Sequence, residues 1–168
     1  GRVIVDSDSV LTLDKIPTSM IVVGGGVVGC QYASIFAALG VRVTLVSLRP
    51  RLLTHIDAEI SEALSQQLTS RHGVSVHSGA EVTHIETEGD HARATLSNGF
   101  EVSADCLLYA AGRRGNSAGL GLEQLGVRTD DRGFVQVDEQ YRTAVPHIFA
   151  AGEVIGFPAL ASTSMEQA

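Results

Sequence analysis

Glycines at fixed spacing carry the clearest chemical signal in this chain of 168 residues. Residues 24–29 read Gly-Gly-Gly-Val-Val-Gly, a Gly-x-Gly-x-x-Gly turn between an apolar run and a stretch with helical spacing. Gly24 would allow the tight turn, Gly26 would let a pyrophosphate approach bare backbone, and Gly29 would let the helix pack against the strand. The helix N-terminus adds free N–H groups and a partial positive charge. The predicted dinucleotide-binding residues of this loop are Gly24, Gly26, Val27, Val28 and Gly29.

The preferred nucleotide depends on the residue that follows the second predicted strand. An acid at that position accepts a hydrogen bond from the ribose 2′-hydroxyl of NAD, whereas this chain has Ser47. Arg49 and Arg51 follow, and their forked guanidinium groups suit a 2′-phosphate, although an exposed basic loop is the alternative. The pattern favours NADP(H) and does not exclude NAD(H).

The elements around the loop follow from hydrophobic spacing. Apolar and β-branched runs predict strands at 20–23, 41–46 and 74–76, with a possible short strand at 3–5. Helical spacing predicts helices over 27–39 and 57–73, with Asp57 as the N-cap of the second. Because β-α-β crossovers are right-handed, these elements predict a parallel, Rossmann-like sheet.

The pattern then changes to a three-stranded antiparallel β-meander at 81–86, 92–96 and 100–102. Asn98-Gly99 is typical of a type I′ hairpin turn. The apolar run 106–110 should return to the parallel sheet as a buried strand. Gly112 follows its carboxyl end, where open α/β sheets place ligands, so its backbone is a further candidate contact to the nucleotide. The predicted fold class is therefore α/β.

A domain boundary is expected near Gly112. Residues 1–112 form the predicted NAD(P)-binding domain. Residues 113–168 hold too few apolar side chains for a core of their own, so they are expected to be part of a larger domain.

The amino-acid composition of the chain argues against several classes of function. The net charge of −7 and the lack of a basic tract argue against nucleic-acid binding. The apolar runs are too short for a membrane span and no signal peptide is visible, so a cytoplasmic protein is expected. The two cysteines are far apart and the six histidines lack paired ligand spacing, so we expect no metal site.

Three separate blocks resemble the flavin-dependent pyridine nucleotide–disulfide oxidoreductases. They are residues 21–29 (IVVGGGVVG), 108–113 (LYAAGR) and 143–153 (TAVPHIFAAGE). The resemblance implies that FAD is bound in the intact protein and that 113–168 is the returning part of an FAD domain. It also implies that the chain is an internal piece, because family members begin with a separate FAD-binding glycine motif and end with a dimerisation domain. A homodimer or larger homo-oligomer is therefore expected for the intact protein.

The resemblance also implies roles for single residues. Gly152 and Glu153 would lie on a strand end beside FAD, and Ala161 belongs to the same terminal block. Gln31 stands where family members carry a glutamate near the nicotinamide and flavin, which removes a charge but keeps hydrogen bonding. Glu153 replaces an aspartate. Arg51 is less diagnostic than Arg49, because NAD-preferring family members often carry an arginine there.

Further matches within the family resemble its soluble pyridine nucleotide transhydrogenases, at residues 6–9, 29–36, 104–109 and 154–162. This implies an oxidoreductase that exchanges hydride between NADPH and NAD through flavin, with no catalytic side chain in this segment and no activity of the segment alone. Two alternatives remain open. One is a segment of a dihydrolipoamide dehydrogenase-like dithiol oxidoreductase, whose cysteine pair would lie upstream. The other is a non-catalytic dinucleotide-binding module.

Overall fold

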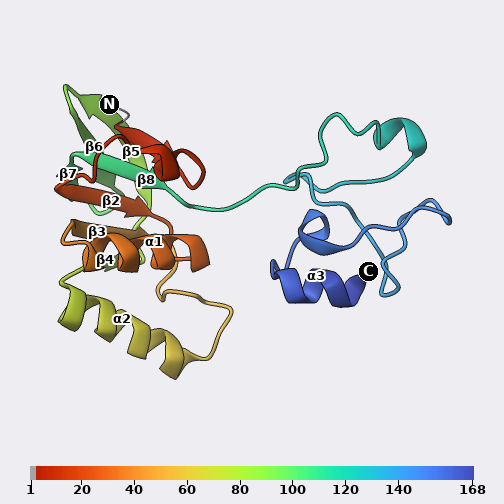
Figure 1. The fold of residues 1–168 in the computed structure, drawn as a ribbon, viewed down its shortest axis with the longest axis horizontal. Helices are drawn as coiled ribbons and strands as arrows, with labels where there is room; N and C mark the ends of the chain where they lie inside the picture. Colours follow the sequence, from red (N-terminus) through yellow and green to blue (C-terminus); the bar gives the residue numbers. More distant parts are fainter. Residues whose placement is uncertain (1–2) are drawn as a thin grey trace. The chain divides into compact units, whose positions relative to one another are not determined.

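A five-stranded sheet organises the first part of the chain (Figure 1). The computed structural model describes residues 3–168, and the chain divides into two units between Gly112 and Arg113. In spatial order the strands are β1 (Ile4–Asp6), β8 (Cys106–Tyr109), β2 (Ser19–Val23), β3 (Arg42–Ser47) and β4 (Ser75–Ser78). Every neighbouring pair is parallel, which confirms the predicted parallel sheet and its late return strand.

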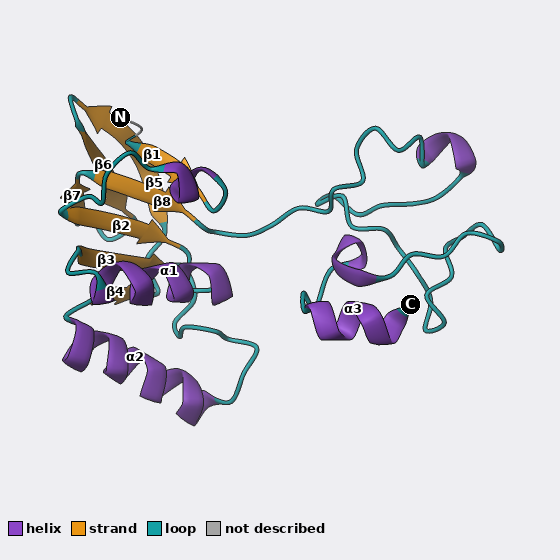
Figure 2. Cartoon of the chain, viewed as in Figure 1, coloured by secondary structure: helices purple, strands orange, loops and turns teal. Residues whose placement is uncertain are grey.

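Helices cover one face of this sheet (Figure 2). They are α1 (Val27–Ala38) and α2 (Ala58–His72), with a short 3-10 helix η1 at Ser9–Thr12. The Asp57 carboxylate caps α2 by accepting from the Glu59 backbone N–H at 2.9 Å, as the sequence predicts. The core on this face consists of α1 residues packed on alternating strand residues, among them Cys30, Ala33, Phe36, Met20, Val22, Leu45 and Leu108.

The antiparallel meander covers the other face. Its strands are β5 (Val82–Glu88), β6 (His91–Leu96) and β7 (Glu101–Ala104). Its buried alanines and Leu96 pack with the strand residues Ile21, Val23, Val46 and Leu107. The sheet is thus buried on both faces, which explains its continuous apolar strands.

The turn between β6 and β7 differs from the predicted type I′ turn. That turn needs positive φ at both central residues, yet only Gly99 has it, with φ of 80°. The loop contains three residues, 97–99, because the Leu96 N–H donates to the Phe100 carbonyl at 2.8 Å and so pairs the two residues across the turn. The longer loop removes the need for two left-handed residues, and the Asn98 side chain accepts from the Phe100 N–H instead.

Residues 113–168 contain little regular structure. The unit holds η2 (Glu123–Leu125), η3 (Gly152–Ile155) and α3 (Ala161–Gln167), and two isolated antiparallel bridges join Thr129 to Val135 and Arg142 to Phe149. The strand end implied at Gly152 is not formed, because Gly152 begins η3. Few apolar side chains are available to hold a sheet in this unit, and only Val127 and Val135 among its large ones are fully buried.

Candidate functional site

A cavity of about 400 Å³ lies at the carboxyl edge of the parallel sheet. Residues that end or follow β2, β3 and β8 line it, together with the loop that joins β4 to β5. Of the predicted site residues, the cavity brings together Gly24, Gly26, Ser47, Arg49, Arg51 and Gly112. We refer to it as the carboxyl-edge cavity.

The glycines of the loop meet different physical demands. Gly24 has φ of 125°, and a Cβ there would lie 2.2 Å from the Ala110 carbonyl oxygen. A Cβ on Gly29 would lie 1.8 Å from the Gly24 carbonyl oxygen, so the close approach of α1 to the turn requires glycine. Gly26 is different, because its backbone is extended and an added Cβ would meet no atom within 4 Å. Gly26 therefore leaves bare backbone facing open space at the start of α1.

Ser47 is the last residue of β3 and is only 2% exposed. Its hydroxyl donates to the Arg49 carbonyl at 3.2 Å, so its proton is used within the loop. The Gly79 N–H donates to the Arg49 carbonyl and the Ala80 N–H donates to the Ser47 carbonyl, both at 3.0 Å. These bonds fix the loop after β3 against the loop after β4.

The two arginines of this loop differ in burial. Arg49 is exposed, whereas Arg51 is half-buried. The Arg51 Nη1 atom is buried and has no hydrogen-bond partner within residues 3–168. A buried cationic N–H without a partner is costly, and an anion in the cavity would supply one. This orphaned donor in the cavity wall makes Arg51 a candidate contact for an anionic ligand.

Other predicted residues lie outside the carboxyl-edge cavity. Val27, Val28, Gly29 and Gln31 lie on the first turns of α1 and do not line it. Gln31 is exposed, and Gly29 is buried against the turn.

The three predicted FAD contacts lie in the unit 113–168. Gly152 is buried, and its N–H donates to the Gln167 side-chain oxygen at 2.8 Å. Glu153 is exposed directly after it, and exposed Ala161 begins α3.

Sequence reasoning missed several parts of the cavity wall. Among them are Tyr109, the last residue of β8, and residues 80–82, which lead from β4 into β5. Both lie at the carboxyl ends of parallel strands, at the edge where Rossmann-like sheets bind ligands, and that position was the signal that could have identified them. Glu81 in this loop adds one acidic side chain to the wall.

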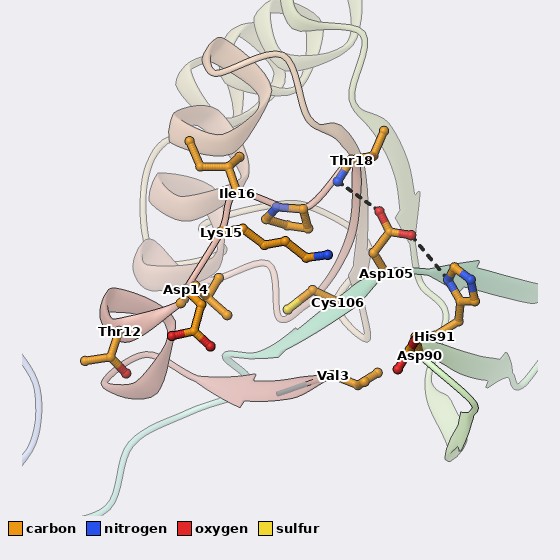
Figure 3. A pocket seen from close by; sticks show the side chains of 12 residues that line it. Val3, Thr12, Asp14, Lys15, Ile16, Thr18, Asp90, His91, Asp105 and Cys106 are labelled. Carbon is orange, nitrogen blue, oxygen red and sulfur yellow. Dashed lines mark hydrogen bonds and ion pairs between the residues drawn. The ribbon is translucent and has the colours of Figure 1, made fainter. Parts of the chain in front are cut away.

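A second cavity, of about 810 Å³, lies at the amino edge of the sheet, where β2 and β8 begin (Figure 3). Asp105, the residue between β7 and β8, connects the elements there. Its carboxylate accepts from the Thr18 N–H at 2.9 Å and the Ser19 N–H at 3.0 Å, and it lies 3.2 Å from His91 Nδ1. We refer to this space as the amino-edge cavity.

Two titratable groups of the amino-edge cavity, Asp105 and Cys106, have shifted pKa values. Partial burial raises the pKa of the Asp105 carboxyl, but the hydrogen bonds from Ser19 and Thr18 and the charge of His91 lower it, so the net pKa is lowered. Burial, with a smaller effect of Asp105, raises the pKa of the Cys106 thiol to about 11. Burial also raises the pKa of Cys30 to about 11. Both thiols therefore stay protonated near neutral pH and are poor nucleophiles.

Within residues 3–168, no three or more histidine, cysteine or acidic side chains gather in a group that could hold a metal ion. In the same range, no helix combines the length and the apolar character that crossing a bilayer requires.

Comparison with known proteins gives a consistent result. The family model described as pyridine nucleotide-disulphide oxidoreductase matches residues 1–168. Soluble pyridine nucleotide transhydrogenases from Yersinia enterocolitica and Yersinia pestis are 46% identical to this chain over 164 residues, which is 98% of this chain and 35% of theirs. The chain thus spans about a third of the length of these relatives.

Solved structures share the same fold. The HOCl-induced flavoprotein disulfide reductase RclA from Escherichia coli matches with a TM-score of 0.87 and 28% identity, over 98% of this chain and 37% of that one. LpdA from Mycobacterium tuberculosis matches with a TM-score of 0.87 and 30% identity, over 97% of this chain and 35% of that one.

Proposed function

This chain belongs to the pyridine nucleotide-disulphide oxidoreductase family, and on that premise we propose that residues 1–112 bind NADP(H) or NAD(H) in the carboxyl-edge cavity. The observation that carries the proposal is the open backbone at Gly26, which a side chain could occupy without any clash in this structure. Glycine there has no packing reason, whereas the approach of a pyrophosphate gives it one.

The geometry supports a specific orientation of the dinucleotide. The pyrophosphate would lie on the backbone of residues 24–26, at the N-terminus of α1, whose first turn contains no acidic side chain to oppose it. The adenosine half would extend toward the end of β3. There Arg49 would meet the 2′-phosphate, and Arg51 Nη1 would gain the acceptor that it lacks.

For the intact protein we propose an FAD-dependent soluble transhydrogenase that exchanges hydride between NADPH and NAD. The 46% identity to transhydrogenases, against 28–30% to the disulfide reductase and LpdA structures, favours this function over a dithiol oxidoreductase. The flavin would supply the hydride chemistry, and this chain's residues would bind and orient the nucleotides. We propose that the intact protein is a cytoplasmic homo-oligomer, on the family resemblance alone.

Residues 113–168 would contribute one side of the FAD site. Glu153 offers an exposed carboxylate directly after buried Gly152, and α3 follows within a few residues, beginning at Ala161. A carboxylate at this position can accept hydrogen bonds from sugar-like hydroxyls. Its extra methylene, compared with the family's aspartate, would place that acceptor farther from the backbone.

The test of nucleotide choice is Arg49→Ala, with titration calorimetry using NADPH and NADH. NADPH binding should weaken by roughly 1–3 kcal/mol, the scale for losing a charged hydrogen-bond partner, whereas NADH binding should not change. Arg42→Ala is the matched control, because Arg42 is an exposed arginine at the opposite end of β3. An equal loss for both nucleotides would exclude recognition of the 2′-phosphate by Arg49. A wild-type chain that binds neither nucleotide would overturn the proposed function itself.

A further inference from the structure

We propose that Glu81 is a specificity-determining residue of the carboxyl-edge cavity, whose charge disfavours the 2′-phosphate of NADP(H) relative to the 2′-hydroxyl of NAD(H). The proposal rests on the proposed function of this cavity. Within residues 3–168, Glu81 is the only carboxylate in the cavity wall, which also contains the cationic Arg49 and Arg51. Charges of opposite sign in one wall act against each other in the choice between an anionic phosphate and a neutral hydroxyl.

Backbone hydrogen bonds hold Glu81 beside the end of β3. The residue before it, Ala80, donates its N–H to the Ser47 carbonyl at 3.0 Å. On the other side, the Glu81 N–H donates to Ser97 Oγ at 3.1 Å, and the Glu81 carbonyl accepts from the Ser97 N–H at 2.8 Å. The backbone of Glu81 is therefore fixed between the end of β3 and the antiparallel meander.

The Glu81 carboxylate is not neutralised by the protein. Its side chain is exposed, and in the part of the chain that the structure describes it makes no ion pair and no hydrogen bond. Three other glutamates of the meander, Glu86, Glu88 and Glu101, all pair with Arg93. Glu81 thus leaves an uncompensated negative charge at the cavity.

The order of the strands determines which half of the ligand lies near Glu81. The glycine turn follows β2, β3 is the neighbour of β2, and β4 lies beyond β3. In a Rossmann-like sheet the adenosine ribose lies at the end of the strand that β3 represents here. Glu81 comes after β4, on the far side of β3 from the glycine turn. It therefore lies at the adenosine end of the proposed site.

A carboxylate at the adenosine end distinguishes the two nucleotides by charge. A phosphate monoester carries about two negative charges near neutral pH, so the carboxylate repels it. The 2′-hydroxyl of NAD(H) is neutral and can donate a hydrogen bond to the same carboxylate. Glu81 would thus limit the preference for NADP(H) that Arg49 and Arg51 create, and a site that exchanges hydride between both pools must accept each nucleotide in turn.

The experiment uses Glu81→Gln, which removes the charge and keeps the size of the side chain. In the 168-residue chain, calorimetry should show NADPH binding strengthened by about two- to tenfold, the range for a screened repulsion across several ångströms, and NADH binding unchanged or weaker. The fragment 2′,5′-ADP should follow NADPH, and 5′-AMP should follow NADH, because the fragments differ only in the 2′-phosphate. At about 1 M salt, where the Debye length is about 3 Å, the gain should largely disappear.

Glu62→Gln is the matched control. Glu62 is an exposed glutamate on α2 that does not line the cavity, and its replacement changes the net charge equally. The NADPH-to-NADH affinity ratio should stay at the wild-type value in Glu62→Gln and should rise further than in Glu81→Gln when Glu81→Lys reverses the charge. Circular dichroism checks that the variants are folded.

Three results would overturn the proposal: an unchanged affinity ratio in Glu81→Gln, an equal gain for both nucleotides, or the same shift of the ratio in Glu62→Gln. Failure of the wild type to bind either nucleotide would instead overturn the proposed function.

Discussion

The two edges of the parallel sheet carry cavities that differ in how their polar groups are satisfied. The amino-edge cavity is the larger, at about 810 Å³ against about 400 Å³. Its central carboxylate, Asp105, already accepts two backbone N–H groups and pairs with His91. The carboxyl-edge cavity instead has open backbone at Gly26 and an unpartnered Nη1 on Arg51.

The difference gives a physical reason to prefer the smaller cavity as the proposed binding site. A carboxylate that is satisfied by its own chain holds segments together, because its hydrogen bonds would be lost if a ligand took its donors. Unpartnered donors and bare backbone gain hydrogen bonds only when a ligand arrives. The smaller cavity is therefore the better candidate for binding, and the larger one for structural cohesion.

Gly26→Val should have the largest effect on nucleotide affinity, and it tests the open backbone of the carboxyl-edge cavity. A branched side chain would occupy the space that the pyrophosphate needs, so NADPH affinity should fall about a hundredfold or more, as expected for two lost charged hydrogen bonds of roughly 1.5–3 kcal/mol each. The thermal unfolding midpoint should barely change, since no atom lies within 4 Å of the new Cβ. Calorimetry and thermal unfolding measure the two quantities.

Gly29→Ala is the matched control for Gly26→Val, because the structure has no room for a side chain at position 29. The added Cβ would lie 1.8 Å from the Gly24 carbonyl oxygen, so the variant should lose stability. If Gly26→Val retained nucleotide affinity, the loop would be a structural turn and the contrast between the edges would fail.

Arg51→Met tests the role of the unpartnered Nη1 atom. It removes this donor and keeps an extended, apolar side chain. We expect a loss of about tenfold in NADPH affinity, the low end for a charged hydrogen bond. The free energy of unfolding should stay the same or rise, because a buried N–H without a partner is removed. A clear loss of stability with unchanged affinity would mean that Arg51 serves packing.

Asp105→Ala tests the amino edge and should have the smallest effect. It removes two backbone hydrogen bonds at a partly exposed site, so the free energy of unfolding should fall by about 1 kcal/mol while NADPH affinity stays unchanged. A change in NADPH affinity in a folded variant would show that the two edges are coupled.

The pH dependence of Asp105→Ala follows from its lowered pKa in the folded chain. A carboxylate with a lowered pKa contributes stability above its ordinary pKa of 3.8, and that contribution is lost as the pH falls through the lowered value. The difference in the free energy of unfolding between the wild type and Asp105→Ala should thus be constant near neutral pH and vanish in acid. Denaturant unfolding at several pH values measures it.

Much of the fold was predictable because its signals are local. Asp57 and Gly73 mark the ends of α2 by side-chain capping and a left-handed φ of 64°, which sequence patterns report directly. The parallel sheet could be predicted because β-α-β crossovers are right-handed. The form of the β6–β7 turn was not predictable, since Asn98-Gly99 is compatible with several loop lengths and pairing across the loop decided among them.

The candidate site was only partly predictable for a related reason. The glycine turn and the loop after β3 lie close together in sequence, so one motif indicated both. Tyr109 and Glu81 reach the same cavity from strands far along the chain. The unpartnered state of Arg51 Nη1 depends on the burial of one atom, which no sequence pattern encodes.

The position of β8 between β1 and β2 has a consequence for how the chain is made. Ile4 pairs with Leu107, so β1 has no neighbour in the sheet until the roughly one hundred residues that separate the two strands have been synthesised. Closing so long a loop is entropically costly and slows folding. Until then, β1 and one edge of β2 are open to pairing with other chains. We therefore expect this unit to fold late and in one cooperative step, with nascent chains that end before Tyr109 prone to aggregation.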